Sequence, residues 1–289
     1  AGNKMDSMTQ DIEVTMSDKV DIDKLQATAR DTLEITFTDV LDDFEAEDIV
    51  IKAGTKEWKT KDIAGVDTKV KDGKTIAVFT LDDAEDNLLN YDATYGEGSE
   101  GVEVTIVSEP KSETRYGKKL DPTARKIAED KIKPALYDDG KDSDYAKVDE
   151  DAGKYVKDYL NVTVTDDTYF DATIFFSEKI EVLGGNLVLA GSELVITLDG
   201  DSLVNMKDYE VIKVDEDANG VAYLTIRFKG EDVKDGDDVI GQKFEGDLEI
   251  GLAESLEYIT DDEDNVIEKF DPIEVDNLEL KNYEEEVKE

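Results

Sequence analysis

The chain of 289 residues contains neither cysteine nor histidine. The absence of cysteine excludes disulfides, zinc–thiolate sites and thiol nucleophiles. The absence of histidine removes the most common general base and the most common ligand for transition metals. Carboxylates alone can hydrolyse glycosides, but a chain with 75 acidic residues offers carboxylate pairs almost anywhere, so no pair is specific. We therefore expect no enzymatic activity, and we name no catalytic or cofactor-binding residue.

Long hydrophobic runs are also missing. No stretch approaches 18 consecutive apolar residues, so we expect no membrane-spanning segment. The first five residues, Ala-Gly-Asn-Lys-Met, lack the hydrophobic core of a signal peptide. We interpret the chain as a mature or excised segment.

Basic residues are few, 33 against 75 acidic ones, which gives a net charge of −42. Nucleic acids and anionic lipids need a basic surface, so neither is an expected partner. The hydrophobic fraction of 39% is enough to fill cores, which places the acidic residues on a folded surface. Such self-repulsion destabilises a compact state. High salt, bound divalent cations or an alkaline habitat would each offset it, and the sequence does not choose among them.

Short runs of strict alternation dominate the pattern, and they predict antiparallel strands with one buried face. Between the runs lie turns rich in Gly, Asp and Asn, as expected for β-sandwiches. The clearest alternating runs are 32–37, 102–106, 194–198, 224–228 and 248–252. A helix is expected over 143–160, where apolar residues recur near a 3.6-residue period behind Ser143 as an N-cap.

Matching segments recur in the same order in the two halves, which indicates a diverged domain duplication. The pairs are 31–41 with 167–180, 44–51 with 187–191, 75–80 with 223–228, and 102–108 with 248–253. We place the boundary after Pro134, because proline suits a stiff crossing between domains. Residues 1–134 hold 19 basic and 31 acidic residues, a net charge of −12, which leaves −30 for residues 135–289. The second domain is the expected place for cation sites.

Several segments resemble the immunoglobulin-like repeats of bacterial S-layer proteins. The segment from Ala172 to Ile180, ATIFFSEKI, resembles the strand and turn that open such a repeat, and residues 33–41 are a weaker version. Residues 258–267 resemble the closing segment, and residues 128–136 the linker between repeats. The resemblance implies an all-β fold of two tandem immunoglobulin-like β-sandwich domains, 1–134 and 135–289, with a short helical insertion.

Calcium takes six to eight oxygen ligands, and four acidic segments could supply them. Asp215 to Gly220 has oxygens at positions 1, 3 and 5 and glycine at 6, as in an EF-hand loop, but position 12 is Ile226, so it is not an EF-hand. Each segment is open to two interpretations, a calcium site or a solvated acidic turn. The candidate metal ligands are Asp215, Asp217, Asn219, Asp235, Asp237, Asp261, Asp262, Asp264, Asn265, Asp138, Asp142 and Asp144.

The resemblance implies a structural role in an extracellular lattice at the cell surface. The partners would then be other copies of the chain, assisted by calcium, and a cell-wall polymer bound through a region that is not in this chain. Two alternatives remain open: a spacer or ligand-binding region of an adhesin, and an accessory region of a secreted glycan-active enzyme. Trp58 is the only tryptophan, and we expect it to pack in a core or at a sheet edge instead of forming a sugar-binding platform.

Overall fold

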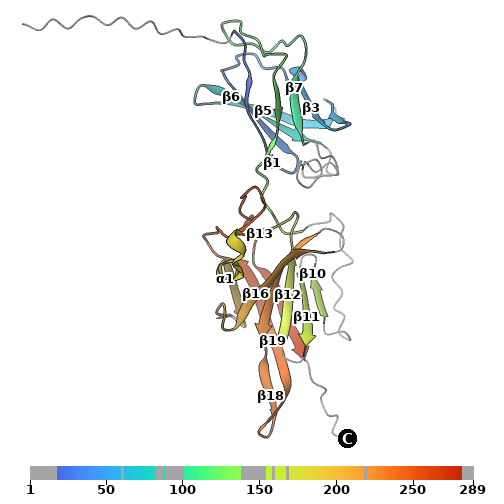
Figure 1. Cartoon of the computed structure of the whole chain (residues 1–289), viewed down its shortest axis with the longest axis vertical. Coiled ribbons are helices and arrows are strands. Elements are labelled where there is room, and N and C mark those ends of the chain that lie inside the picture. Colours follow the sequence, from blue (N-terminus) through green and yellow to red (C-terminus); the bar gives the residue numbers. More distant parts are fainter. Residues whose placement is uncertain are drawn as a thin grey trace, which may run out of the picture. The chain divides into compact units, whose positions relative to one another are not determined.

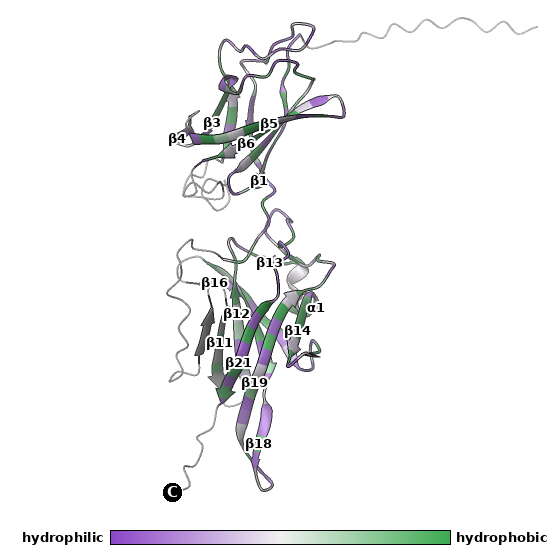
Figure 2. Ribbon diagram, turned by 180° about the vertical axis from the view of Figure 1, so that it is seen from behind, coloured by the Kyte–Doolittle hydropathy of each residue, from purple (hydrophilic) through white to green (hydrophobic). Residues whose placement is uncertain are grey.

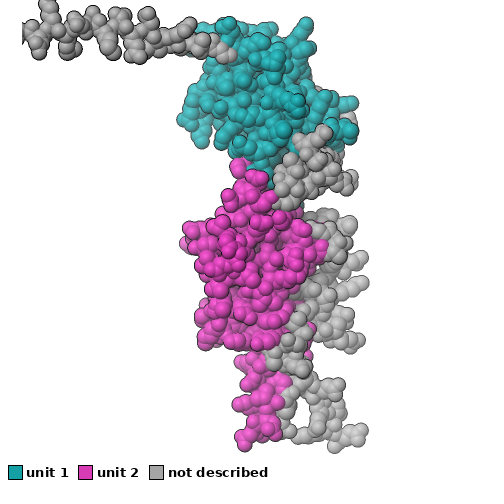
Figure 3. Space-filling view, viewed as in Figure 1, with its two compact units in different colours: residues 1–130 teal, residues 131–289 magenta. Residues whose placement is uncertain are grey.

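The computed structural model describes residues 18–59, 62–82, 88, 101–137, 154–157, 160–166, 169–217 and 221–281. The chain divides into two compact units, unit 1 (Ala1–Asp130) and unit 2 (Lys131–Glu289), shown in separate colours in Figure 3. The predicted boundary after Pro134 lies a few residues further along the chain. Both units are built almost entirely from strands, as the alternating pattern predicted.

Unit 1 contains two sheets (Figure 1). Neighbouring strands are antiparallel except for β1 and β9, which pair in parallel. The first sheet has the order β5 (Ile63–Lys71), β6 (Lys74–Leu81), β2 (Thr32–Phe37), β1 (Ile22–Ala29) and β9 (Glu129–Asp130). The second has the order β4 (Lys56–Trp58), β3 (Ile49–Ala53), β7 (Glu103–Ile106) and β8 (Arg125–Ile127). A short 3₁₀ segment, Ala46–Asp48, precedes β3.

Alternation along the strands builds the core of unit 1. Leu33, Ile35 and Phe37 on β2 are fully buried, while the intervening residues are only partly covered. The rings of Phe44 and Phe79 meet edge to face, with centroids 6.2 Å apart. Burial of one face of each sheet is what fixes the register of these strands, because a shift by one residue would turn the apolar set outward.

Unit 2 has two larger sheets and a two-stranded pair, β13 (Glu181–Val182) with β20 (Ile259–Thr260). Its one described α-helix is α1 (Leu187–Ser192). The first sheet has the order β10 (Lys154–Lys157), β11 (Leu160–Asp166), β12 (Tyr169–Phe175), β17 (Ala222–Lys229) and β16 (Tyr209–Glu216). The second contains β15 (Asp201–Ser202), β14 (Leu194–Leu198), β19 (Asp238–Leu252), β18 (Glu231–Asp235) and β21 (Ile273–Lys281), of which β21 pairs with β19.

The core of unit 2 is centred on a stack of three phenylalanines. Phe244 on β19 stacks against both Phe170 and Phe228, which are cross-strand partners on β12 and β17, with ring centroids 5.6 Å and 4.9 Å away. Hydrophobic and hydrophilic residues alternate along β19 and β21, whereas β18 is largely hydrophilic (Figure 2). The second half of β19 therefore pairs with β21 and packs in the core, whereas its first half forms a hairpin with β18.

The two units share one strand order. The sequence β5-β6-β2-β1 in unit 1 corresponds to β16-β17-β12-β11 in unit 2. Likewise, β4-β3-β7-β8 corresponds to β15-β14-β19-β21. Strands β10, β13, β18 and β20 and helix α1 are additions found in unit 2 among the described elements. Three of the four predicted segment pairs fall on equivalent strands, namely β2 with β12, β6 with β17, and β7 with β19.

The predicted helix over 143–160 is wrong in its described part, and one of the four predicted segment pairs is also wrong. In the described part of 143–160, Lys154–Lys157 forms β10 and pairs with β11, so this stretch is not helical. The strand is favoured over a helix because its backbone groups form hydrogen bonds with β11 at the edge of the sheet. The spacing of apolar residues in the sequence does not reveal this tertiary pairing. The helix lies instead at α1, in the segment matched to β3 in the repeat, and the true counterpart of β3 is β14.

Candidate cation-binding loops and contact surfaces

The acidic turn 261–265 follows β20 and is closed by its own first residue. Asp261 is 3% exposed, and its Oδ1 accepts hydrogen bonds from the backbone N–H groups of Glu263 and Asn265, at 2.9 and 2.7 Å. Its Oδ2 accepts from the side-chain Nδ2 of Asn265 at 2.7 Å. Asp264 adopts a positive φ of 60°, which an Asx residue tolerates. The turn is thus held by Asp261 and Asn265, whereas Asp264 is exposed.

Glu178, in the turn after β12, approaches this turn from another part of unit 2. Its carboxylate lies within 4.8 Å of that of Asp261. Two carboxylates at this distance repel each other when both are ionised. A carboxylate offers about four lone-pair positions, and three hydrogen bonds to Asp261 use three of them. An all-oxygen donor set of this kind suits calcium.

Asp215 and Asp217 both have partners within the described chain. Asp215 is the seventh residue of strand β16, where its Oδ2 lies 2.8 Å from the Nζ of Lys213. The hydrogen bond from Lys213 lowers the pKa of the Asp215 carboxyl below its ordinary value. Asp217 closes the hairpin by accepting the N–H of Val221 at 2.9 Å. Asn219, the third predicted ligand, lies outside the described residues.

The hairpin that carries Asp235 and Asp237 is a two-residue turn between β18 and β19. Asp235 pairs with Asp238 across it, and Gly236 adopts the positive φ of 65° that such a turn requires. Asp237 is exposed at the tip. The side chain of Asp235 is outside the description, as are Asp138, Asp142 and Asp144 altogether. Among the predicted segments, the turn 261–265 is the one whose described carboxylates include a member of a cluster of acidic groups from distant parts of the chain.

Two buried carboxylates that the sequence did not single out have structural roles. Glu193, just after α1, accepts the backbone N–H groups of three successive residues, Glu257, Tyr258 and Ile259. Asp48, at the end of the 3₁₀ segment in unit 1, accepts the N–H groups of Lys111 and Ser112 at 2.8 and 2.6 Å. Each carboxylate ties a loop to the sandwich. No local signal marks them, because their partners lie more than 60 residues away along the chain.

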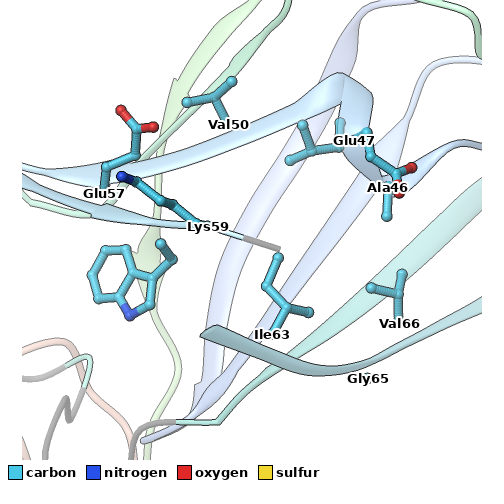
Figure 4. A pocket seen from close by; sticks show the side chains of 10 residues that line it. Ala46, Glu47, Val50, Glu57, Lys59, Ile63, Gly65 and Val66 are labelled. Carbon is cyan, nitrogen blue, oxygen red and sulfur yellow. The ribbon is translucent and has the colours of Figure 1, made fainter. Parts of the chain in front are cut away.

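A hollow of about 330 Å³ lies beside the edge strand β5 in unit 1 (Figure 4). Ala46, Val50, Ile63 and Val66 contribute apolar surface, and Glu47, Glu57 and Lys59 contribute charge. Trp58 also lines it but is only 3% exposed, which confirms its expected role in packing. The lining shows no group arranged for a particular ligand chemistry.

Comparison with known protein families gives one match, and it lies in unit 1. Residues 23–131 match the model of a family described as outer cell wall protein domain 7. The match runs from the second residue of β1 to the residue after β9, and so covers both sheets of unit 1. No curated protein matches the chain. No helix in the described part is long and apolar enough to cross a membrane. The likeness indicates a structural role at the cell wall or cell surface.

Proposed function

We propose that this chain is a structural component of a bacterial surface layer, which assembles with further copies of itself into an extracellular lattice. The observation that carries the proposal is the match of residues 23–131 to an outer cell wall protein domain. A folded, strongly acidic surface agrees with it, because a net charge of −42 keeps an exposed protein soluble and repels anionic polymers.

The proposal includes an immunoglobulin-like fold for both units. In immunoglobulin-like sandwiches one sheet has the strands A, B, E and D and the other has C, F and G, with C′ added in some members. Assigning β1, β2, β6 and β5 to A, B, E and D, and β4, β3, β7 and β8 to C′, C, F and G, reproduces that order in unit 1. The same assignment holds for the equivalent strands of unit 2. Two tandem domains of one type suit a protein that builds by repetition.

Calcium is proposed as an assisting ion, with Glu178 and Asp261 among its ligands. A divalent cation between them would cancel the repulsion of two carboxylates within 4.8 Å and would reduce the charge of the more acidic half. Two side chains do not fill a calcium shell, so water and backbone oxygens would complete it. Ligand binding to the folded state alone would raise the melting temperature by mass action.

The test combines a melt with an assembly assay. The full chain is heated in chelator and in millimolar calcium, and the same samples are examined by light scattering and negative-stain electron microscopy. The proposal predicts a calcium-dependent rise in melting temperature, and growth of particles into sheets. Glu178→Gln should lose most of the calcium-dependent shift, whereas Glu254→Gln, which removes an exposed carboxylate, should keep it.

The outcomes separate the two parts of the proposal. Sheets that form equally well in chelator would remove calcium from the account and leave the lattice. A chain that stays monomeric at high concentration in calcium would contradict the lattice and favour a spacer region of an adhesin.

A further inference from the structure

Met206 in unit 2 combines two features that a folding argument does not explain. It adopts a positive φ of 66°, and every other non-glycine residue with positive φ in the described part of the chain is Asp or Asn. Those residues tolerate the left-handed region, whereas methionine is strained there. The residue is also 54% exposed. Asparagine or glycine at this position would relieve the strain and improve solubility, so the methionine points to a contact.

Two further exposed apolar residues lie near Met206, namely Val204 on the same turn and Val188 on α1, and we call the three the Val188–Val204–Met206 patch. The three residues are joined through Asn205, whose Nδ2 donates to the backbone oxygen of Val188 on α1 at 2.9 Å. All three apolar side chains are exposed. The chain from 183 to 210 around this patch carries four acidic residues besides the buried Glu193, and one basic residue. The patch is therefore an apolar centre in acidic surroundings, which is the plan of a protein contact surface.

Unit 1 carries a feature of opposite character at the turn 114–117. Tyr116 is 75% exposed, and the guanidinium of Arg115 lies 4.5 Å from the centre of its ring. The segment 111–119 contains four basic residues and one acidic residue, a net charge of +3 in a chain of −42. Tyrosine and arginine are among the residue types that contribute most to protein contacts.

This Arg115–Tyr116 tip is held in place before any contact forms. The N–H of Gly117 donates to the backbone oxygen of Thr114 at 2.8 Å, which closes the turn. The N–H of Arg115 donates to the carboxylate of Asp42, and the N–H groups of Tyr116 and Lys118 donate to Thr114 Oγ1. A tip that is already ordered loses little conformational entropy when it binds.

We infer that the Arg115–Tyr116 tip of one copy docks on the Val188–Val204–Met206 patch of a second copy. The aromatic ring would cover the apolar centre, and the Arg115 guanidinium beside it would face the acidic surroundings, so apolar fit and charge agree. Because the two surfaces differ, one such contact leaves a free tip and a free patch on the pair, and the contact can then repeat from copy to copy. The inference rests on the proposed lattice and names one contact within it.

The absence of cysteine allows a direct test with the full chain. Tyr116→Cys and Met206→Cys are prepared separately, mixed under assembly conditions and oxidised. The inference predicts a disulfide-linked dimer of unlike variants as the main product on a non-reducing gel. The control mixture pairs Tyr116→Cys with Val239→Cys, whose position on β19 is 55% exposed and therefore equally accessible. It should give at most one tenth of that yield.

A second variant separates contact from folding. Met206→Asn should melt at the same or a higher temperature, because asparagine tolerates positive φ. The same variant should assemble less readily, with a critical concentration for assembly at least tenfold higher than that of the unmodified chain. Sheets that form without the mixed cross-link, or Met206→Asn sheets that form normally, would overturn this contact and leave the lattice proposal intact. Absence of any assembly by the unmodified chain would overturn both.

Discussion

Glu193 offers the sharpest test of how unit 2 is held together. Its side chain is almost fully buried, and its two carboxylate oxygens accept the N–H groups of Glu257, Tyr258 and Ile259. The backbone oxygen of Glu193 also accepts the N–H of Ala253 at 2.7 Å. One residue therefore fixes both ends of the loop between β19 and β20. Glu193→Gln keeps the size of the side chain but places an amide NH₂ where one oxygen accepted hydrogen bonds.

The expected loss of stability follows from the hydrogen bonds that the amide cannot accept. If the Gln oxygen keeps the bonds to Glu257 and Tyr258, the buried N–H of Ile259 faces a second donor. An unsatisfied buried donor costs about 1–3 kcal/mol, and a hydrogen bond to a charged acceptor is worth about 1.5–3 kcal/mol. These two costs overlap, so we expect a loss of about 2–4 kcal/mol. For a unit of this size that corresponds to a fall of about 5–15 °C in melting temperature.

The assay uses the position of the single tryptophan. Trp58 is buried in unit 1, so its fluorescence follows the unfolding of that unit, whereas calorimetry detects both units. Glu193→Gln should shift a calorimetric transition and leave the fluorescence transition in place. Glu254→Gln removes the same charge from an exposed position and controls for reduced self-repulsion. If the two variants melt within about 1 °C of each other, the reasoning about Glu193 is refuted.

Three further predictions concern other carboxylates. Asp171 and Arg227 form a bidentate ion pair across β12 and β17, with both N···O distances 2.9 Å. A double-mutant cycle with Asp171→Asn and Arg227→Gln should give a coupling free energy of about 1–3 kcal/mol in urea unfolding. If the two substitutions have additive effects, the predicted coupling is wrong. Asp48→Ala leaves two backbone N–H groups without their acceptor. The free energy of unfolding of unit 1, followed by Trp58 fluorescence, should therefore fall by about 2–4 kcal/mol. An unchanged transition would show that the loop does not depend on Asp48. The hydrogen bond from the Val204 N–H lowers the pKa of Asp208 in the folded state. The Asp208 carboxylate therefore stabilises the folded state above its unfolded pKa of about 4, and this stabilisation is lost as the pH falls through the lower folded pKa. In an acid titration, Asp208→Asn should lose stability less steeply below pH ~4 than the unmodified chain does.

Much of the fold could be predicted because burial of one sheet face leaves a direct trace in sequence. The runs around Leu33, Ile174, Ile196 and Ile250 all lie on strands of the predicted kind. Short apolar runs gave less, since LVLAG at 187–191 fits a strand or a helix turn equally well. The deciding feature is Asn186, whose Oδ1 accepts the N–H of Val188 and caps α1.

The candidate sites were harder to predict, because they depend on contacts between distant segments. Composition identified the acidic turn 261–265, but Glu178 reaches it from a turn more than 80 residues earlier in the chain. Composition also selected Asp215, which the register of β16 places on a strand beside Lys213. Nothing in the sequence around Met206 marks it, since its significance lies in a backbone angle that only the folded turn at 204–208 imposes.

The parallel pairing of β1 with β9 has a mechanical consequence for unit 1. These two strands are the first and last described strands of the unit, and Gln26 and Ala27 pair with Glu129 and Asp130. A pull on the two ends of the unit draws parallel strands past each other in opposite directions. Their hydrogen bonds are then loaded together in shear, instead of opening one after another as in an unzipping hairpin. In a layer under lateral tension, this pair would act as a clamp that keeps the sandwich folded until the load exceeds the strength of all its bonds at once.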